Sequence, residues 1–340
     1  MTERVTPKQA GFHMPAEWVP HARTWMMWPS REEVWTSIAE TRANYTHVAH
    51  AIRAFEPLTM VVRAEDKAEA QSMLGSDIDL MVHPIDDSWA RDAGPCFLSD
   101  GSGNRAGAAF EFNAWGGKYA PFDGDNSVAE AILEDVGVPV FKSDLIAEGG
   151  GISVDGEGTI LTTESCFPNA NRNPEWSRDA ISQELMEMLG GEKVIWLPGN
   201  AEETETDGHV DGVAVFGAPG VVLIQDTGAP DHYWHDIHSA NIAAVEGQTD
   251  ARGRSLRLVR MPDASAIQVE GSEICDSYVN SYICNGGVIM PKYGLREDDL
   301  VREILEDVLP DRRVVQVDIA SIAIGGGGLH CITQQEPRTI

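Results

Sequence analysis

The sequence predicts a mixed α/β fold that is rich in antiparallel strand pairs. Amphipathic helical patterns alternate with short apolar strands along the whole chain. Several of these strands are separated by turns of the kind that close tight hairpins. A parallel sheet built from strict βαβ units would not need so many short hairpins. Because no Pro- or Ser-rich linker interrupts the pattern, we expect residues 1–340 to form a single domain.

Two helices are indicated in the first part of the chain by apolar residues at helical spacing. The first covers about residues 38–55 and precedes an apolar strand at residues 58–62. The second should begin at Asn173, whose side chain can cap a helix, with Pro174 in its first turn. It should end at Gly190.

The later part of the chain combines a third helix with two hairpins. The helical pattern extends from about residue 296 to residue 309. One hairpin should pair residues 213–216 with 221–225 across a Gly-Ala-Pro-Gly turn. Another should pair residues 279–284 with 288–290 across an Asn-Gly dipeptide, which tight hairpins prefer.

Clusters of polar residues and glycines interrupt the apolar strands at similar intervals. They centre on Asp92, Glu148, His209, Ser277 and Cys331. The intervals between these positions are 56, 61, 68 and 54 residues, so about five modules of similar length fill the chain. The modules do not resemble one another in sequence, and the rhythm is therefore only weak evidence for a repeat.

The charge balance limits the partners of the protein. The chain has 54 acidic and 25 basic residues and a formal net charge of −29. This disfavours nucleic acid, which needs a basic face, and suits a small cationic substrate. No apolar run approaches the ~18 residues of a membrane span, and the first residues do not form a secretion signal. We expect a cytoplasmic protein without a membrane partner.

The pattern of the five cysteines does not indicate a disulfide framework. Their number is odd, they are widely spread, and none lies in a C-x-x-C pair. This argues against both a set of disulfides and a zinc ribbon. Most of the thiols should be buried and structural.

Two of the polar clusters place acidic residues beside glycines. In residues 86–95, three acids and Arg91 surround Trp89. In residues 148–158, Glu148 precedes three glycines, where a backbone can approach a ligand closely. Taken singly, each stretch is also typical of a surface turn or a hairpin.

The third cluster pairs a histidine with a carboxylate. His209 and Asp211 are two positions apart, so at the head of a strand both side chains would point to the same face. A histidine beside a carboxylate is a general acid/base arrangement. The pair could also ligate a metal or be structural. No second His-x-His or H-E-x-x-H element completes a coordination set, so we predict no metal.

The last cluster, residues 325–337, places Cys331 beside His330 after four glycines. No Gly-Lys-Ser/Thr follows the glycines, which disfavours a phosphate loop. Residues 314–324 should form a largely apolar strand that leads into the cluster. A lone cysteine is more often buried and inert than reactive.

Considered together, the clusters favour a guanidinium ligand. Carboxylates that lie close together repel one another and raise one another's pKa values unless a cation lies between them. A planar guanidinium pairs with carboxylates on both sides and leaves its central carbon open to a thiolate. The carboxylates should raise the pKa of the thiol in the empty protein, and a bound guanidinium should lower it.

The sequence resembles the agmatine deiminases, relatives of the bacterial-type peptidylarginine deiminases in the guanidine-modifying superfamily. The resemblance rests on ordered blocks: DDSWARDAGP, EGGGISVDGEGTILTTE with NANRNP, TDGHVDG, SYVNSYICNGGVIMPKYG and GGGGLHCITQQEP. It implies a five-bladed pseudo-symmetric α/β propeller, the pentein fold, with a central active site. It also implies a homo-oligomer, a dimer or larger, with no metal or organic cofactor.

The matching motifs imply a role for each reactive residue. Cys331 resembles the nucleophile and His209 the general acid/base, while Asp92, Glu148 and Asp211 resemble the carboxylates that hold the guanidinium and the histidine. The implied reaction converts agmatine and water to N-carbamoylputrescine and ammonia, a step of polyamine biosynthesis, through a covalent amidino intermediate on Cys331. Alternatives are a deiminase of arginine, peptidyl arginine or another guanidine, a guanidine- or polyamine-binding protein, and a metal-dependent amidase.

Three positions depart from the family pattern and bear on the substrate. Ser153 stands where the family usually has histidine, and Gly212 and Gly328 stand where it usually has asparagine. None of them is a core catalytic group, so the departures should reshape the pocket rather than remove the chemistry.

The remainder of the substrate should contact residues near these positions. We expect contacts with Trp89, Asp86, Gly328 and Asp207. The methylenes of agmatine would pass Trp89, and its distal ammonium would reach the acidic run Glu203-Glu205-Asp207. That run could instead be a solvated loop.

Overall fold

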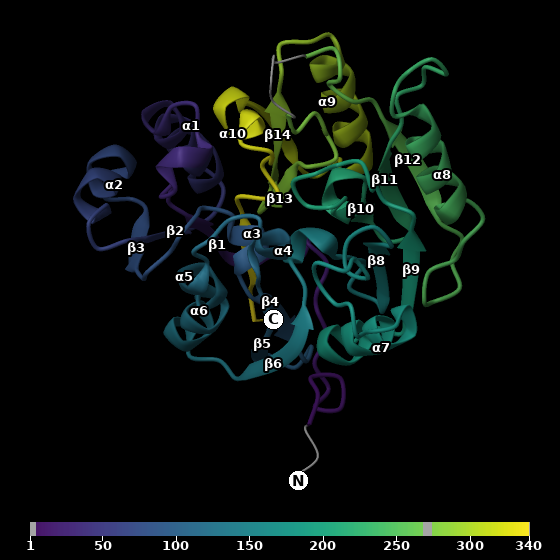
Figure 1. Cartoon of the computed structure of the whole chain (residues 1–340), viewed down its shortest axis with the longest axis horizontal. Coiled ribbons are helices and arrows are strands. Elements are labelled where there is room, and N and C mark those ends of the chain that lie inside the picture. Colours follow the sequence, from purple (N-terminus) through teal and green to yellow (C-terminus); the bar gives the residue numbers. More distant parts are fainter. Residues whose placement is uncertain (1–4, 268–273, 340) are drawn as a thin grey trace.

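The computed structural model describes residues 5–267 and 274–339 of the chain. Within these ranges the strands form five sheets, one of four strands and four of three. In the view of Figure 1 the sheets and their helices follow one another around the molecule in chain order. No helix in the described ranges is long and apolar enough to cross a membrane.

The four-stranded sheet joins the two ends of the chain. Its order is β16 (Gln334–Pro337), β1 (His21–Met27), β2 (Leu58–Val62) and β3 (Asp79–Val82). β16 is antiparallel to β1, whereas β2 is parallel to β1 and β3 is parallel to β2. The two parallel connections contain α1 (Ile38–Arg53) and α2 (Lys67–Leu74), because parallel neighbours need a crossover.

The other four sheets share one pattern, in which two antiparallel strands precede a helix and a third, parallel strand. The second sheet contains β4 (Cys96–Ser99), β5 (Arg105–Glu111) and β6 (Val140–Ile146), with α4 (Ala114–Gly117), α5 (Asp123–Asn126) and α6 (Val128–Val136) between β5 and β6. The third contains β7 (Ser153–Val154), β8 (Thr159–Thr163) and β9 (Lys193–Leu197), with α7 (Arg178–Leu189).

The last two modules repeat this order. The fourth sheet contains β10 (Ala214–Ala218), β11 (Val221–Gln225) and β12 (Arg257–Met261), with α8 (His235–Val245). The fifth contains β13 (Tyr282–Cys284), β14 (Gly287–Lys292) and β15 (Arg313–Asp318), with α9 (Glu297–Val308) before β15 and α10 (Ala320–Ile324) after it. In this module Val301 and Leu305 of α9 pack against Val288 and Met290 of β14 in a buried core.

Most of the predicted elements are confirmed. The helix predicted over residues 38–55 is α1, capped by Ser37, whose Oγ accepts from the Glu40 N–H. The strand at residues 58–62 is β2, and the helix at residues 296–309 is α9. Both hairpins are present as the antiparallel pairs β10–β11 and β13–β14.

Two predictions about element ends are wrong. Asn173 does not cap α7, because its side chain instead accepts from the Ile146 N–H and donates to the Phe167 carbonyl. Ser177 is the cap, with its Oγ accepting from the Ala180 N–H at 3.2 Å. The strand predicted over residues 314–324 ends at Asp318, whose carboxylate accepts from the Ala320 N–H as the chain turns into α10.

The polar clusters lie on short segments between the regular elements. Asp92 lies in α3 (Ala90–Ala93), and the glycines after Glu148 form a 3-10 turn, Gly149–Gly151. A second 3-10 turn, Val210–Gly212, follows His209. α3 contacts the first turn and the first turn contacts the second, so three clusters that are distant in the sequence come together.

Candidate active site

Cys331 lies between α10 and β16 with its side chain buried. Its backbone carbonyl accepts from the Arg91 N–H at 3.0 Å, which ties the segment to α3. Its Sγ lies 3.3 Å from Asn280 Nδ2, which donates to it, and 3.7 Å from Asp211 Oδ2. Burial raises the pKa of the Cys331 thiol well above its ordinary value, and the carboxylates of Asp211 and Asp92 raise it further. This direction agrees with the expected effect of the carboxylates on the thiol.

The glycines before Cys331 allow its neighbours to approach. A Cβ at Gly327 would overlap the indole ring of Trp89, and a Cβ at Gly328 would overlap the side-chain oxygen of Asn280. Larger residues at these two positions would therefore displace groups that border the thiol. The backbone of Gly328 also hydrogen-bonds Cys331 and lowers the pKa of its thiol, against the larger effect of burial.

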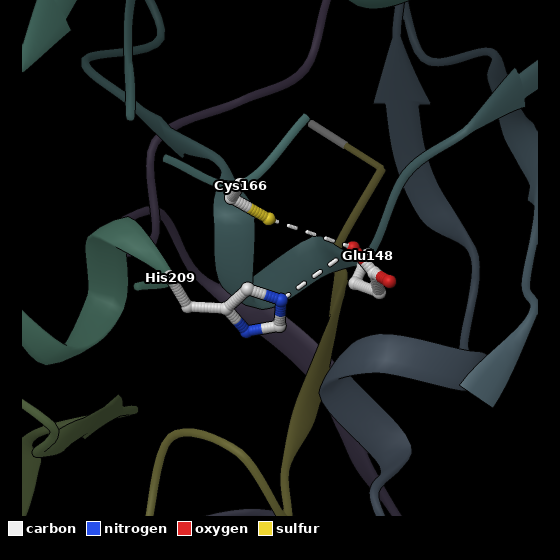
Figure 2. Close-up of side chains that lie close together, drawn as sticks. All are labelled: Glu148, Cys166 and His209. Carbon is white, nitrogen blue, oxygen red and sulfur yellow. Dashed lines mark hydrogen bonds and ion pairs between the residues drawn. The ribbon is translucent and has the colours of Figure 1, made fainter. Parts of the chain in front are cut away.

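His209 begins the second 3-10 turn, and its ring is buried. Its Nδ1 lies 3.7 Å from Asp92 Oδ1. Its Nε2 lies 3.5 Å from Glu148 Oε2 (Figure 2). Both contacts are too long for good hydrogen bonds, and neither ring nitrogen has a hydrogen-bond partner in the described structure. Burial lowers the pKa of His209, but Asp92, Cys166 and Glu148 outweigh burial, so the pKa lies well above its ordinary value.

Gly150 marks the point where the reactive groups converge. A Cβ added there would lie 2.5 Å from His209 Nδ1, 2.7 Å from Asp92 Oδ1 and 3.1 Å from Asp211 Oδ2. The Gly150 N–H donates to Asp92 Oδ1 at 2.9 Å. Glycine is therefore needed here, because any side chain at this position would collide with the histidine and with both carboxylates.

Asp92 and Asp211 are held in different electrostatic environments. Burial raises the pKa of Asp92, and His209 opposes this only in part. Its Oδ2 accepts from the Trp115 indole N–H at 2.9 Å. Burial also disfavours the Asp211 carboxylate, but His330 outweighs it and holds the pKa of Asp211 below its usual range. His330 lies between Asp211 and Glu17, at 2.8 Å from each carboxylate.

His209 and Asp211 are arranged differently from the prediction. His209 precedes the 3-10 turn before β10 and Asp211 lies within it, rather than both at the head of the strand, so strand alternation does not place them. Both nevertheless reach the groups around Gly150. Asp211 bonds the ring of His330, a contact that its spacing from His209 does not predict.

Glu148 is paired with a buried arginine. Its Oε1 lies 2.6 Å from Arg172 Nε, and both side chains are fully buried. Burial disfavours the carboxylate, but Arg172 and His209 outweigh it, and the pKa of Glu148 is held below its usual value. Asp207 receives the other side of the same guanidinium at 2.7 Å and Lys118 at 2.9 Å.

One group of side chains could ligate a metal ion. Glu148, Cys166 and His209 offer ligand atoms within 4.8 Å of one another, and Figure 2 shows them converging. The chemistry of the set does not suit a cation, because Arg172 already neutralises Glu148. Burial raises the pKa of the Cys166 thiol, which opposes the thiolate that a metal would need.

Three of the residues expected to contact the substrate have other partners in the structure, and their roles stay predictions. Asp207 is neutralised by Arg172 and Lys118, so it offers no free charge to an ammonium. Asp86 accepts from the Gly124 N–H and borders neither cavity beside Cys331, because it holds the start of α5. Gly328 borders neither cavity either, because it packs against Asn280. Trp89 does border a cavity.

Two cavities meet at Cys331. The tail cavity, of about 300 Å³, is bordered by residues that include Trp89, Asp92, Trp115, Tyr119, Glu205 and Cys331. The histidine-side cavity, of about 840 Å³, is bordered by residues that include His209, Asp211, Gly212, His238, Ser277 and Cys331. No Lys or Arg occurs among the described residues that border either one, so both suit a cation.

Sequence reasoning missed several residues of the site. Arg172 lies in the NANRNP motif and Asn280 in the SYVNSYICNGGVIMPKYG motif. Because their partners are distant in the chain, no local pattern predicts their contacts. Glu17 and Trp115 also escaped notice. The signal for Arg172 is its position in a polar, glycine-poor loop within an acidic chain, where a buried arginine needs acidic partners.

Comparison with known proteins gives a consistent family. The profile of the Porphyromonas-type peptidyl-arginine deiminases matches residues 13–337. An agmatine deiminase of Ectopseudomonas mendocina is 41% identical over an alignment that covers 99% of this chain and 98% of the relative. One of Stutzerimonas stutzeri is 40% identical, with coverage of 98% and 97%.

Solved structures agree with this. The agmatine deiminase of Enterococcus faecalis superimposes with a TM-score of 0.95 at 36% identity, covering 100% of this chain and 99% of the other. DDAH of Pseudomonas aeruginosa, at 13% identity and a TM-score of 0.55, shares the fold over 93% of this chain and 99% of its own. The five sheets fit a pentein-type fold. The chain belongs to the family of Porphyromonas-type peptidyl-arginine deiminases.

Proposed function

We propose that the protein is a hydrolase that deiminates a small guanidine, with agmatine as its substrate and N-carbamoylputrescine and ammonia as its products. The observation that carries the proposal is the convergence of Cys331, His209 and buried carboxylates beside two cavities whose described borders lack lysine and arginine. Relatives named agmatine deiminase, about 40% identical over nearly the whole chain, support the choice of substrate.

The guanidinium would bind between Asp92 and Asp211. An oxygen of each carboxylate lies close to the point that a Cβ at Gly150 would occupy, 2.7 Å away for Asp92 and 3.1 Å away for Asp211, and a planar guanidinium can pair with two carboxylates. The cation would also relieve the repulsion between the two carboxylates. Its central carbon would then face Cys331 Sγ, which lies 3.7 Å from Asp211 Oδ2.

The reaction would proceed in two steps that use the same histidine. The Cys331 thiolate attacks the guanidinium carbon, and His209 donates a proton to the leaving nitrogen, which departs as ammonia. The raised pKa of His209 keeps it protonated for this step. His209 then takes a proton from water, the water attacks the amidino intermediate, and the ureido product leaves as the thiol is restored.

The chain of agmatine would occupy the tail cavity. The rings of Trp89, Trp115 and Tyr119 border it and would contact the methylenes. At Glu205, one carboxylate oxygen accepts from the Tyr119 hydroxyl at 2.6 Å, and no arginine or lysine among the described residues pairs with this carboxylate. Of the acidic run, Glu205 is therefore the residue that would receive the distal ammonium, in place of Asp207.

Several wider features belong to the same proposal. The five sheets would close into a five-bladed propeller around the site, with residues 1–340 as one catalytic domain. We also propose that the enzyme acts in the cytoplasm as a homo-oligomer and that it needs neither metal nor organic cofactor. The pairing of β16 with β1 supports closure, since it joins the last strand to the first sheet.

One assay tests the proposed reaction. Agmatine, arginine and a blocked arginine ester are given to the purified protein, with and without chelator, while ureido product and ammonia are measured. We expect product from agmatine in both conditions, its loss in Cys331→Ser, and its retention in the control Cys284→Ala. Turnover of arginine in preference to agmatine would contradict the substrate, and loss of activity with chelator would favour a metal-dependent amidase.

A further inference from the structure

The histidine-side cavity adjoins the part of the site from which the leaving nitrogen departs. The two cavities share a small border made of Glu205, Thr206, Gly326 and Cys331. Beyond it, Trp89 and Asp92 border only the tail cavity, whereas His209 and Asp211 border only the histidine-side cavity. The proposed proton donor for the leaving group therefore faces the second cavity and not the first.

This cavity is much larger than ammonia requires. Bounded by the described residues, its volume is about 840 Å³, far more than one molecule the size of water needs. The space also reaches the acid/base motif itself, because Gly212 borders it and a Cβ at Gly212 would have no heavy atom within 4 Å. A substituent on the leaving nitrogen would have room to extend beside His209.

The border of the cavity also carries buried polar atoms that lack partners among the described residues. His238 and Ser277 both border it and are more than nine-tenths buried. The Nδ1 of His238 and the Oγ of Ser277 have no hydrogen-bond partner among the described residues. Buried polar atoms are usually paired, so these two are suited to a ligand that brings a hydroxyl or amino group.

We infer that the enzyme also accepts agmatines that carry a second, short polar substituent on the leaving nitrogen, and that it releases this substituent as a primary amine. The inference rests on the proposed deimination. Cys331 forms the C–S bond, the bond from the guanidinium carbon to the substituted nitrogen breaks, and His209 gives that nitrogen its proton. The amidino intermediate is the one formed from agmatine, so one water again yields N-carbamoylputrescine and no further reactant is needed.

Substituted agmatines test this directly. Agmatine, N′-methylagmatine and N′-(3-hydroxypropyl)agmatine are incubated with the full chain, and the released amine, ammonia and ureido product are separated. We expect N-carbamoylputrescine from all three, with methylamine or 3-aminopropanol in place of ammonia. Turnover of agmatine alone would overturn the inference and leave the proposed function intact. Release of ammonia with a disubstituted urea would also overturn it, because the substituent would then lie away from the leaving side.

Two variants locate the substituent. Gly212→Gln extends a side chain into the open space that Gly212 borders and should lower kcat/KM for the hydroxypropyl compound, relative to agmatine, by about tenfold. Ser277→Ala removes one unpartnered hydroxyl and should lower the same ratio by about fivefold. An unchanged ratio in both variants would place the substituent elsewhere and overturn the inference. If the parent protein did not turn over agmatine itself, the proposed function would be overturned instead.

Discussion

The side-chain amide of Asn280 donates a hydrogen bond to the Sγ of Cys331 across 3.3 Å. The same side chain is fixed by its Oδ1, which accepts from the His330 backbone N–H at 3.0 Å. A donor to sulfur favours the thiolate over the thiol. Asn280 therefore opposes Asp211 and Asp92, which disfavour the thiolate.

Replacing Asn280 should make the nucleophile harder to ionise. In Asn280→Ala we expect the pKa of the Cys331 thiol to rise and kcat/KM for agmatine to fall by about tenfold, since a hydrogen bond to a charged group is worth about 1.5–3 kcal/mol. The rate of alkylation by iodoacetamide is measured against pH, and the profile should move to higher pH.

Gly328 supplies a matched variant for the same contact. A Cβ in Gly328→Ala would overlap Asn280 Oδ1 and displace the amide, so the alkylation profile should shift in the same direction. The double variant should be no worse than the more impaired single variant, because both remove one interaction. A profile for Asn280→Ala that coincides with that of the parent protein would rule out this role.

Binding of a planar cation should release a proton from the empty enzyme. Burial and Asp211 hold the pKa of the Cys331 thiol well above its ordinary value, so the thiol is protonated near neutral pH. A cation between the carboxylates lowers that pKa, and the proton leaves. Calorimetric titration with a short alkylamidine, in buffers of different ionisation enthalpy, measures the release. Equal release by Cys331→Ser would show that the proton comes from another group.

Removing Arg172 should destabilise the fold strongly. In Arg172→Gln the buried Glu148 loses its partner, and breaking such a pair costs about 3–5 kcal/mol. The pKa of Glu148 is lower in the folded state than in the unfolded state. The ion pair therefore stabilises the fold fully above the unfolded-state pKa of Glu148, and this stabilisation is lost as the pH falls through the folded-state pKa. The free energies of unfolding of Arg172→Gln and of the parent protein, measured by urea denaturation, should therefore differ less in acid than at neutral pH.

Arg178 provides the control for this variant. It pairs with Glu164 at 2.7 Å, but both side chains are about half exposed. Arg178→Gln should change the free energy of unfolding by about 1 kcal/mol or less. A similar, small loss in Arg172→Gln would mean that the buried pair contributes no more than a surface pair.

Glu205 should select for the distal ammonium. In Glu205→Gln we expect kcat/KM for agmatine to fall by about tenfold, through KM, because a charge-assisted contact is lost. Butylguanidine, which lacks the ammonium, should be hardly affected. Glu202→Gln serves as the control, since Glu202 is exposed and borders neither cavity. An equal fall for agmatine and butylguanidine would argue against this assignment.

The sequence is informative where the determinants are local. Helix α1 and the β13–β14 hairpin were predictable because spacing and turn residues act over a few positions. The start of α7 was not, because Asn173 is drawn away by Ile146, a partner 27 residues distant. The choice between two plausible caps was thus made by tertiary contacts.

The same distinction holds in the site. His209, Asp211 and Cys331 could be predicted from motifs, but which acids remain charged and free could not. Asp207 resembles Glu205 in the sequence, yet Lys118, 89 residues away, neutralises only the former through its side chain. Asn280 is 51 residues from Cys331, and its contact with the thiol exists only in the folded chain.

The pairing of β16 with β1 joins a strand near the end of the chain to the first strand, which bears on the order in which the fold forms during synthesis. Trp25 of β1 donates to Glu336 of β16 at 2.9 Å, so the segment just after Cys331 is anchored on the first strand of the chain. During synthesis that first strand must wait for nearly the entire polypeptide before its partner emerges. We therefore expect the segment after Cys331 to be fixed late in synthesis, and a chain that ends before β16 to lack this anchor.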